Sequence, residues 1–187
     1  MIKNLENVSH YRRPGACDGS PAVRLRPYDI SDVAALTQAV QESVHDMSRW
    51  MPWGHAAYGR SDAVAWIHAS RKAHETASTH DFAVVDTEGC ILGGCGINQI
   101  NHATGVANLG YWVRSSMTGR GVAPAAVRQL TEWVFGHTSL HRLEIVVAVS
   151  NPRSQRVAEK VGAHQDAVLR KRVLVDGLPE DAVLYSI

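Results

Sequence analysis

The period of the hydrophobic residues changes along the chain, and each change predicts a new element. Residues 23–26 alternate between apolar and basic side chains and indicate a short strand that ends at Pro27. Apolar residues then recur about every 3.6 positions over residues 33–45 and again over 61–71, which predicts two amphipathic helices. The expected N-caps of these two helices are Ser31-Asp32 and Ser61-Asp62.

Three apolar segments separated by turn residues follow the second helix. Residues 82–85, 91–97 and 106–113 have the composition of strands, so an antiparallel meander is expected. A helix is predicted over about 122–135. The continuous apolar run 143–149 then predicts a central strand that is covered on both faces.

The last part of the chain predicts a short helix and a hairpin. Asn151 and Pro152 begin the helix, and Gly162 is placed to end it. Residues 167–175 and 181–187 flank a turn and predict the hairpin. The whole order is β-α-α-β-β-β-α-β-α-β-β, which indicates an α/β protein with a mixed sheet.

The composition is that of one globular domain. The chain has 187 residues, 45% hydrophobic and 20% charged, with a net charge of +1. We expect a domain over 23–187 preceded by a loose N-terminal extension, residues 1–22, which is rich in turn formers. The balanced charge argues against nucleic acid or an anionic membrane as a partner. Without a signal peptide or a run of about 18 apolar residues, a cytoplasmic protein is expected.

The cysteines and histidines predict no metal site or disulfide framework. The three cysteines, Cys17, Cys90 and Cys95, form no C-x-x-C pair, and their number is odd. The ten histidines are scattered, and no H-E-x-x-H motif is present. Cys90 and Cys95 are expected to be buried as small apolar residues.

A glycine-rich loop before the third helix is the strongest candidate for a phosphate site. Gly119-Arg120-Gly121 allows backbone N–H groups to approach a ligand, and the helix that follows presents its positive end there. The loop lacks the lysine of a Walker motif, and Pro124 stands where a dinucleotide fingerprint has its third glycine. A plain glycine-rich turn is the alternative.

Two motifs occur together, in order, in a known family. Gly110-Tyr-Trp-Val precedes Thr-Gly-Arg-Gly-Val-Ala, and downstream Asn-Pro-Arg-Ser precedes Glu-Lys-Val-Gly162. With the closing hairpin and the segment Trp-Met-Pro-Trp53, they resemble the RimJ/RimL-like branch of the GNAT N-acetyltransferase superfamily. The resemblance extends over about residues 23–187.

The resemblance implies a fold and a cosubstrate. In the GNAT fold two adjacent parallel strands of a mostly antiparallel sheet splay apart, here Val106–Val113 and Leu143–Ser150, and the pantetheine arm of acetyl-CoA lies between them. Thr118 replaces the family's Gln or Arg, which removes one side chain but leaves the backbone cradle. The residues implied to bind acetyl-CoA are Val113, Thr118, Gly119, Arg120, Gly121, Val122, Ala123, Asn151 and Ser154.

The resemblance also points to candidates for proton transfer. Ser154 matches a serine near the CoA sulfur and would protonate the departing thiolate, for which a thiol pKa of about 8.5 makes a strong acid unnecessary. Where many relatives carry a basic glutamate this chain has Asn108, which can hold a water but take no proton. Asp166 matches a glutamate before the last hairpin and is the candidate general base, with a solvated carboxylate as the alternative.

The acceptor pocket of this superfamily follows the first helix. Trp50 and Trp53 are therefore the candidate substrate-binding residues, with local core packing as the alternative. Glu42, Asp46 and His55 are near enough in sequence to meet a cationic amine.

These inferences predict an acetyl-CoA-dependent N-acetyltransferase in which a primary amine attacks the thioester directly. At pH 7 about 10% of an α-amine is neutral but only about 0.04% of a lysine amine, so a weak base favours a protein N-terminus as the acceptor. The alternatives are a small amine, such as an antibiotic, polyamine or amino acid, and a non-catalytic acyl-CoA-binding protein. A homodimer is a possible assembly.

Overall fold

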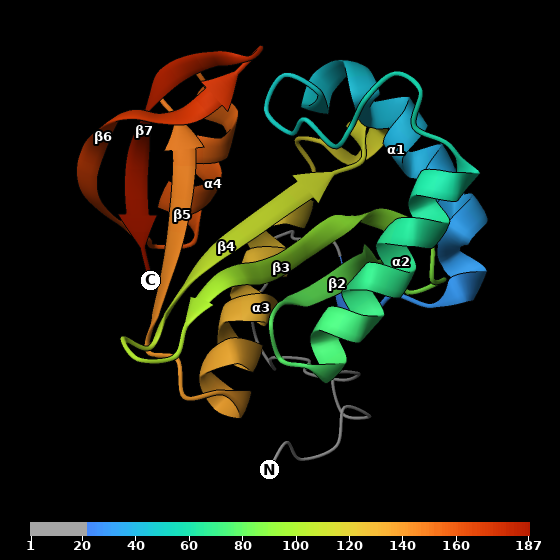
Figure 1. Ribbon diagram of the computed structural model, residues 1–187, viewed down its shortest axis with the longest axis horizontal. Helices are drawn as coiled ribbons and strands as arrows, with labels where there is room; N and C mark the ends of the chain where they lie inside the picture. Colours follow the sequence, from blue (N-terminus) through green and yellow to red (C-terminus); the bar gives the residue numbers. More distant parts are fainter. Residues whose placement is uncertain (1–21) are drawn as a thin grey trace.

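The computed structural model describes residues 22–187, and the predicted order of elements is confirmed (Figure 1). The expected extension, residues 1–22, lies outside the described residues except for Ala22. The strands are β1 (Arg24–Pro27), β2 (His80–Val85), β3 (Ile91–Asn101), β4 (Val106–Val113), β5 (Arg142–Ala148), β6 (His164–Val175) and β7 (Leu178–Ser186). The helices are α1 (Val33–Met47), α2 (Arg60–Glu75), α3 (Val122–His137) and α4 (Pro152–Lys160), with short 3-10 helices η2 (Ile30–Asp32) and η3 (Ser115–Met117).

All the strands belong to one sheet, in the order β1-β2-β3-β4-β5-β7-β6. The neighbours are antiparallel except for β4 and β5, which run parallel because α3 connects them. The expected meander therefore forms one half of the sheet, and the closing hairpin adds the other edge.

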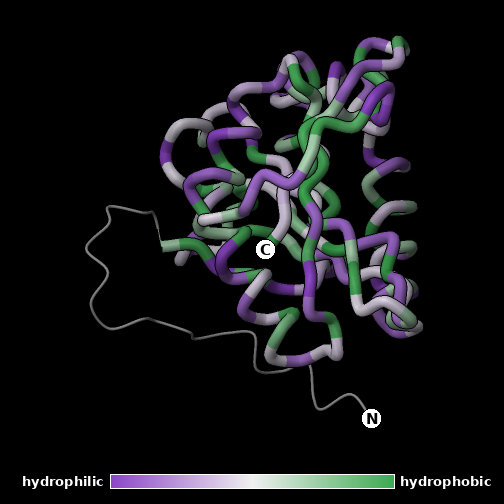
Figure 2. The backbone as a smooth tube through the Cα atoms, turned by 90° about the vertical axis from the view of Figure 1, so that its left-hand side faces the viewer, coloured by the Kyte–Doolittle hydropathy of each residue, from purple (hydrophilic) through white to green (hydrophobic). Residues whose placement is uncertain are grey.

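The helices cover the sheet from two sides, and each side has its own core (Figure 1). α3 and α4 pack on one face, around Leu130 and Leu143, which have no measurable exposure. α1 and α2 pack on the opposite face, around Val40 and Ile67. Figure 2 shows hydrophobic and hydrophilic segments alternating along the tube, as the amphipathic pattern of these elements requires.

The predicted start of α1 is correct in position, because Asp32 is its N-cap, but the Asp32 side chain makes no capping hydrogen bond to α1. Asp29, not Ser31, accepts the backbone N–H of the residue two positions on, and Asp32 reaches back to the N–H of Asp29. Asp32 also accepts two hydrogen bonds from Arg26, with N···O distances of 2.6 and 2.7 Å. A full turn of 3-10 helix therefore precedes α1 and moves the capping side chain upstream to Asp29.

The predicted start of α2 is wrong. Gly59 is the N-cap, and Asp62, in the first turn, accepts the N–H of Gly59 at 2.8 Å. The carboxylate therefore stabilises the helix from inside it, as in the second half of a capping box.

Two burial predictions need correction. β5 is not covered on both faces, because Glu144 and Val146 are half-exposed while Leu143 and Ile145 are buried. Cys95 is buried as expected, but Cys90 is exposed. The half-exposed face of β5 borders the candidate site described next. Within residues 22–187 no helix has the length and apolarity needed to cross a membrane.

Candidate active site

The parallel strands β4 and β5 pair at only three positions and then separate (Figure 1). The last pair joins Asn108 to Glu144, although both strands continue for several residues. The splay that the resemblance implied is therefore present at the expected strands.

Unpaired backbone groups face this opening from both strands. The N–H of Arg114 donates to a carbonyl of β3 at an N···O distance of 2.8 Å, so Val113, one position earlier, points its N–H and C=O away from β3. On β5, Leu143 exchanges both backbone hydrogen bonds with Ile187, so Val146 points its groups away from β7. An extended ligand lying between the strands would find hydrogen-bonding groups on both sides.

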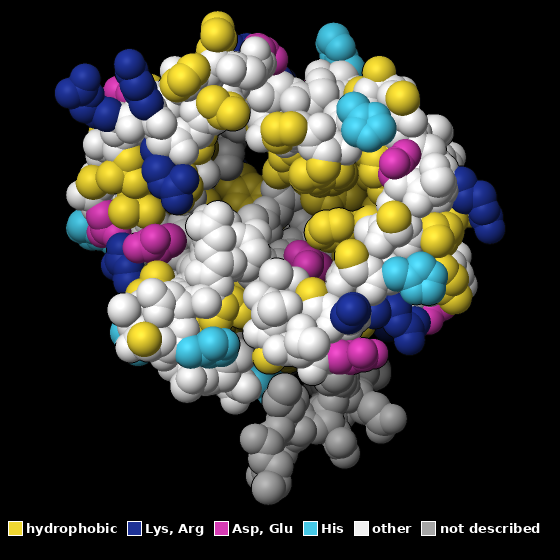
Figure 3. Space-filling view, viewed as in Figure 1, with side chains coloured by type: hydrophobic (Ala, Val, Ile, Leu, Met, Phe, Trp, Pro, Cys, Tyr) yellow, Lys and Arg dark blue, Asp and Glu magenta, His cyan; other side chains and the backbone are white. Residues whose placement is uncertain are grey.

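A pocket of about 130 Å³ occupies the opening. Figure 3 shows a hollow on this face of the molecule, with hydrophobic side chains around it. Its lining comes from both faces of the sheet, from the loop after α1 and from β6: Trp50, Met51, Leu109, Gly110, Tyr111, Ile145, Val146, Val147, Ala148, Asn151, Ser154, Val173, Leu174 and Val175. None of these side chains is charged.

Hydroxyl groups meet on the α4 side of the pocket. The Tyr111 hydroxyl lies 2.8 Å from Oγ of Ser154 and donates to the Ser154 carbonyl at 3.1 Å. Burial raises the pKa of Tyr111 to about 12, so the phenol keeps its proton at neutral pH. Asn151 is the N-cap of α4, and its Oδ1 accepts the N–H of Ser154 at 3.1 Å. The helix cap therefore fixes the position of Ser154 against Tyr111.

The glycine-rich loop has the backbone conformation of an anion site. Gly119 and Gly121 have φ angles of +76° and +81°, where a side chain would be strained. Gly121 is the N-cap of α3 and supplies no capping side chain, so the first turn of α3 presents backbone N–H groups. Val122 and Ala123 are buried, and Arg120 is exposed beside them. Thr118 holds the preceding turn by donating to the carbonyl of Ser115 at 2.9 Å.

Helix α1 anchors the segment that leads to this loop. Glu42 accepts hydrogen bonds from Nε of Arg114 at 2.6 Å and from the backbone N–H of Ser116 at 2.9 Å, and these contacts lower its pKa. Asp46 accepts the hydroxyl of Ser115. Both carboxylates are therefore engaged with η3, and the expectation that they meet a cationic amine is not supported by their contacts.

The two tryptophans proposed for the acceptor lie in different surroundings. Trp50 lines the pocket, and the Arg49 guanidinium lies 4.9 Å from its ring centre. Trp53 is 45% exposed and is not among the lining residues. It stacks on Trp66 and contacts Trp112 edge to face, which places it beside the pocket and not in it.

Asn108, the candidate for holding a water, and Asp166, the candidate general base, both lie outside the pocket. Asn108 donates to the side chain of Asn98 at 3.0 Å, at the point where β4 and β5 begin to separate. Asp166 bonds Arg142 at 2.5 Å and His164 at 2.8 Å. Arg142 begins β5, so Asp166 lies at the end of the strand opposite to the pocket. These contacts hold the pKa of Asp166 well below its usual range, which makes it a weak base.

Gly110 and Tyr111 line the pocket but are not among the site residues predicted from the sequence. Both stand in the motif Gly110-Tyr-Trp-Val, but the motif alone gives no reason to choose among its members. Strand alternation, combined with the splay, would have placed Gly110 and Tyr111 on opposite faces at the opening. Within 22–187 no three His, Cys, Asp or Glu side chains are grouped to hold a metal ion.

Comparison with known proteins gives consistent results. The Acetyltransferase (GNAT) domain family matches residues 22–164. YdaF of Bacillus subtilis (strain 168) is 23% identical over 178 residues, which cover 91% of this chain and 93% of that protein. The ribosomal-protein-serine acetyltransferase of Escherichia coli (strain K12) is 22% identical, with 89% and 93% covered.

Among solved structures, Mycobacterium smegmatis RimJ in complex with CoA-disulfide superposes with a TM-score of 0.84 at 28% identity. The match covers 90% of this chain and 83% of that one. The splayed strands, the glycine loop before α3 and the family match agree with one another. The chain therefore belongs to the GNAT acetyltransferase family and is an N-acetyltransferase of its RimJ/RimL-like branch.

Proposed function

We propose that this protein transfers the acetyl group of acetyl-CoA to the N-terminal α-amine of a protein by direct attack. The opening between β4 and β5 carries the proposal, because its pocket is lined from both faces of the sheet. A thioester that enters from the α4 side would meet an amine that arrives from the α1 side. The acetyl group could then pass directly from one to the other, with no covalent intermediate on the enzyme.

The cosubstrate would bind through backbone groups and one cation. The N–H groups of Gly119 to Ala123, at the positive end of α3, would receive the pyrophosphate, and Arg120 would add a charge-assisted contact. The pantetheine arm would extend along Val113 and Val146, whose backbone groups face the opening.

The pocket residues would assist the transfer as follows. The amine nitrogen attacks the thioester carbonyl carbon and forms a C–N bond, which gives a tetrahedral intermediate. The C–S bond breaks when this intermediate collapses. The backbone N–H of Val113 would stabilise the oxyanion of the tetrahedral intermediate. The hydroxyls of Ser154 and Tyr111 would donate hydrogen bonds to the departing CoA thiolate.

The uncharged lining of the pocket favours a protein N-terminus as the acceptor. The lining carries no charged side chain, so nothing there would hold the second and third ammonium groups of a polyamine. The amine of a protein N-terminus, about 10% neutral at pH 7, fits such a pocket better than a lysine amine. The relatives named as ribosomal acetyltransferases support a protein acceptor.

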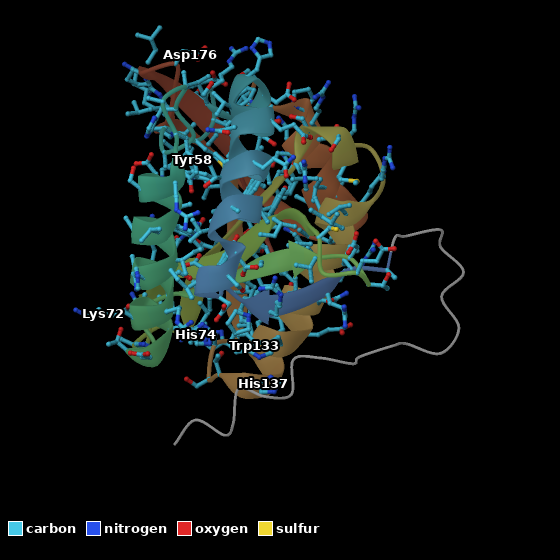
Figure 4. The ribbon with its side chains drawn as sticks, turned by 90° about the vertical axis from the view of Figure 1, so that its right-hand side faces the viewer. Tyr58, Lys72, His74, Trp133, His137 and Asp176 are labelled. Atoms are coloured by element: carbon cyan, nitrogen blue, oxygen red, sulfur yellow. The ribbon has the colours of Figure 1, made fainter. Side chains whose placement is uncertain are left out.

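Calorimetric titration with acetyl-CoA tests the cosubstrate. Arg120→Glu reverses an exposed charge at the loop, and its matched control Lys72→Glu reverses an exposed charge near the far end of α2 (Figure 4). We expect the Arg120 change to weaken binding by about tenfold or more and the control to leave it unchanged. Equal affinities in all three proteins would exclude the loop as the pyrophosphate site.

Mass spectrometry of acetylated products tests the acceptor. The probes are a lysine-free peptide with a free N-terminus, the same peptide with a blocked N-terminus and one lysine, and spermidine. We expect the highest kcat/KM for the free α-amine. A higher value for the lysine peptide or for spermidine would overturn the proposed acceptor.

A further inference from the structure

The pocket contains no group that can take a proton from the acceptor ammonium. Its lining residues carry no carboxylate and no imidazole, and the hydroxyl of Tyr111 is a donor at neutral pH. Asn108 cannot act as a base, and Asp166 is held by Arg142 at the other end of β5. A base for direct transfer would therefore have to reach the pocket from a residue outside its lining.

The carboxylate of Asp81 on β2 faces the pocket across two paired glycines, Gly96 and Gly110. Along β2, Phe82 belongs to the core under α3 and Ala83 to the core under α1 and α2, so Asp81 faces the α1/α2 side. Its carboxylate covers Gly96 of β3, where an added Cβ would lie 2.5 Å from Oδ1. Gly96 is paired with Gly110 of β4, which lines the pocket. Neither glycine contributes a side chain between the carboxylate and the pocket.

The size of the gap suits an amine. A Cβ added at Gly110 would meet no atom within 4 Å, so the Asp81 carboxylate lies farther than that from this point. Paired residues of an antiparallel ladder are about 5.5 Å apart, so Oδ1 lies no more than about 8 Å from it. An amine nitrogen above Gly110 would therefore lie at hydrogen-bond distance from Asp81 either directly or through one water.

The surroundings of Asp81 suit a base. The Thr79 hydroxyl donates to Oδ2 of Asp81 at an O···O distance of 3.0 Å, and this is the one hydrogen bond of the carboxylate within residues 22–187. The other oxygen, Oδ1, faces Gly96. Burial raises the pKa of Asp81, so it holds a proton more strongly than an exposed aspartate. Tyr28 and Cys95, the titratable groups that interact with it, are buried and have raised pKa values, so both are neutral.

We propose that Asp81 is the general base of the acetyl transfer, an inference that rests on the proposed function. The carboxylate takes one proton from the acceptor ammonium over Gly110 and becomes a neutral carboxylic acid. The freed amine attacks the thioester carbon, and the C–S bond then breaks. The attacking nitrogen loses its second proton to the departing thiolate, so the products are a neutral amide and the CoA thiol, and Asp81 releases the first proton to solvent. Protons and charges then balance, and no other reactant is needed.

The test compares acetylation rates of the wild type and Asp81→Asn over a range of pH. Near neutral pH we expect kcat/KM of the variant to fall about 100-fold, with unchanged acetyl-CoA binding as the check on folding. The loss should shrink as pH rises, because the amine then loses its proton unaided. It should be larger for the lysine peptide than for the α-amine peptide, since fewer of its amines are neutral.

Three further variants sharpen the test. Asp81→Glu should recover part of the rate, and Glu88→Gln, which removes an exposed carboxylate at the β2–β3 turn, should leave it unchanged. Gly110→Ala adds a methyl group to open space, so it should fold normally yet raise KM for the peptide.

Two results would overturn the inference while leaving the proposed function intact. One is an Asp81→Asn rate within twofold of the wild type. The other is an equal loss for both peptides at every pH, which would indicate a structural role. Failure of the wild type to acetylate any probe would instead overturn the proposed function, and the role of Asp81 with it.

Discussion

At the scale of single residues, the contact between Tyr111 and Ser154 leads to a direct prediction. Tyr111→Phe removes the hydroxyl that lies 2.8 Å from Oγ of Ser154. Losing this donor should lower kcat by about tenfold, because the thiolate loses one hydrogen bond in the transition state. The affinity for acetyl-CoA should be retained. Steady-state kinetics with calorimetry would check both, and a change confined to KM would contradict the role.

A second residue-scale prediction concerns acid stability and lies away from the pocket. His74 and His80 pack against Trp133, and Figure 4 shows His74, Trp133 and His137 gathered at one end of the molecule. Burial, with the neighbouring His74, lowers the pKa of His80 from 6.5 to about 4. Between these values the unfolded chain binds more protons than the folded one, so the free energy of unfolding should decrease as pH falls.

Thermal unfolding at several pH values would check this. The Tm of the wild type should decline as pH falls from about 6.5 toward 4, and His80→Asn should flatten that decline while lowering Tm near neutral pH. The same slope in the variant would mean that other groups control acid unfolding.

Single residues also show what the sequence could predict. Asn151 and Ser154 follow a strand directly and open a helix, so their neighbourhood is local in sequence and was predictable. Asp81 and Gly110 are 29 positions apart in the chain, and only the β2–β3–β4 register brings them to one face. The family motif predicts a carboxylate at Asp166, but nothing in the sequence predicts that Arg142 binds it.

At the scale of elements, α1 acts on the cosubstrate loop through η3. Glu42→Gln would weaken the contacts to Arg114 and to the N–H of Ser116, and so free the segment before Gly119. We expect acetyl-CoA affinity to fall by about three- to tenfold and stability by about 1 kcal/mol, because the pair is only partly buried. Calorimetry and thermal unfolding would measure both. An unchanged affinity would mean that the loop is held without α1.

The elements themselves were largely predictable, and their ends were not. The hydrophobic period identifies every helix and strand in order, because each buries one stripe or one face. The cap of α2 differs from the prediction because Asp62 acts from within the helix. Asp32 is the N-cap of α1 as predicted, but its side chain turns back to Asp29 and Arg26. β4 and β5 pair at only three positions. The hydrophobic pattern of either strand does not predict where this pairing stops, because the pattern reports burial and not the neighbouring strand.

At the scale of the whole molecule, the pocket is closed by contact between two distant parts of the chain. The loop after α1 supplies Trp50, and the β6–β7 hairpin supplies Val175. Arg49 and Asp176 join them by an ion pair at 3.1 Å, and the Asp176 N–H donates to the Arg49 carbonyl at 3.4 Å. Figure 4 shows Asp176 at the end of the molecule opposite to His74 and His137.

This closure predicts a salt-dependent acceptor affinity. Both side chains of the Arg49–Asp176 pair are more than half exposed, so its loss should cost less than about 1 kcal/mol of stability. Asp176→Asn should nevertheless raise KM for the peptide by a few fold, because Trp50 and Val175 would no longer be held together. High salt should raise the wild-type KM in the same way and leave the variant nearly unaffected. If the variant and the wild type respond equally to salt, the ion pair has no part in closing the pocket, and the backbone hydrogen bond alone holds the two segments.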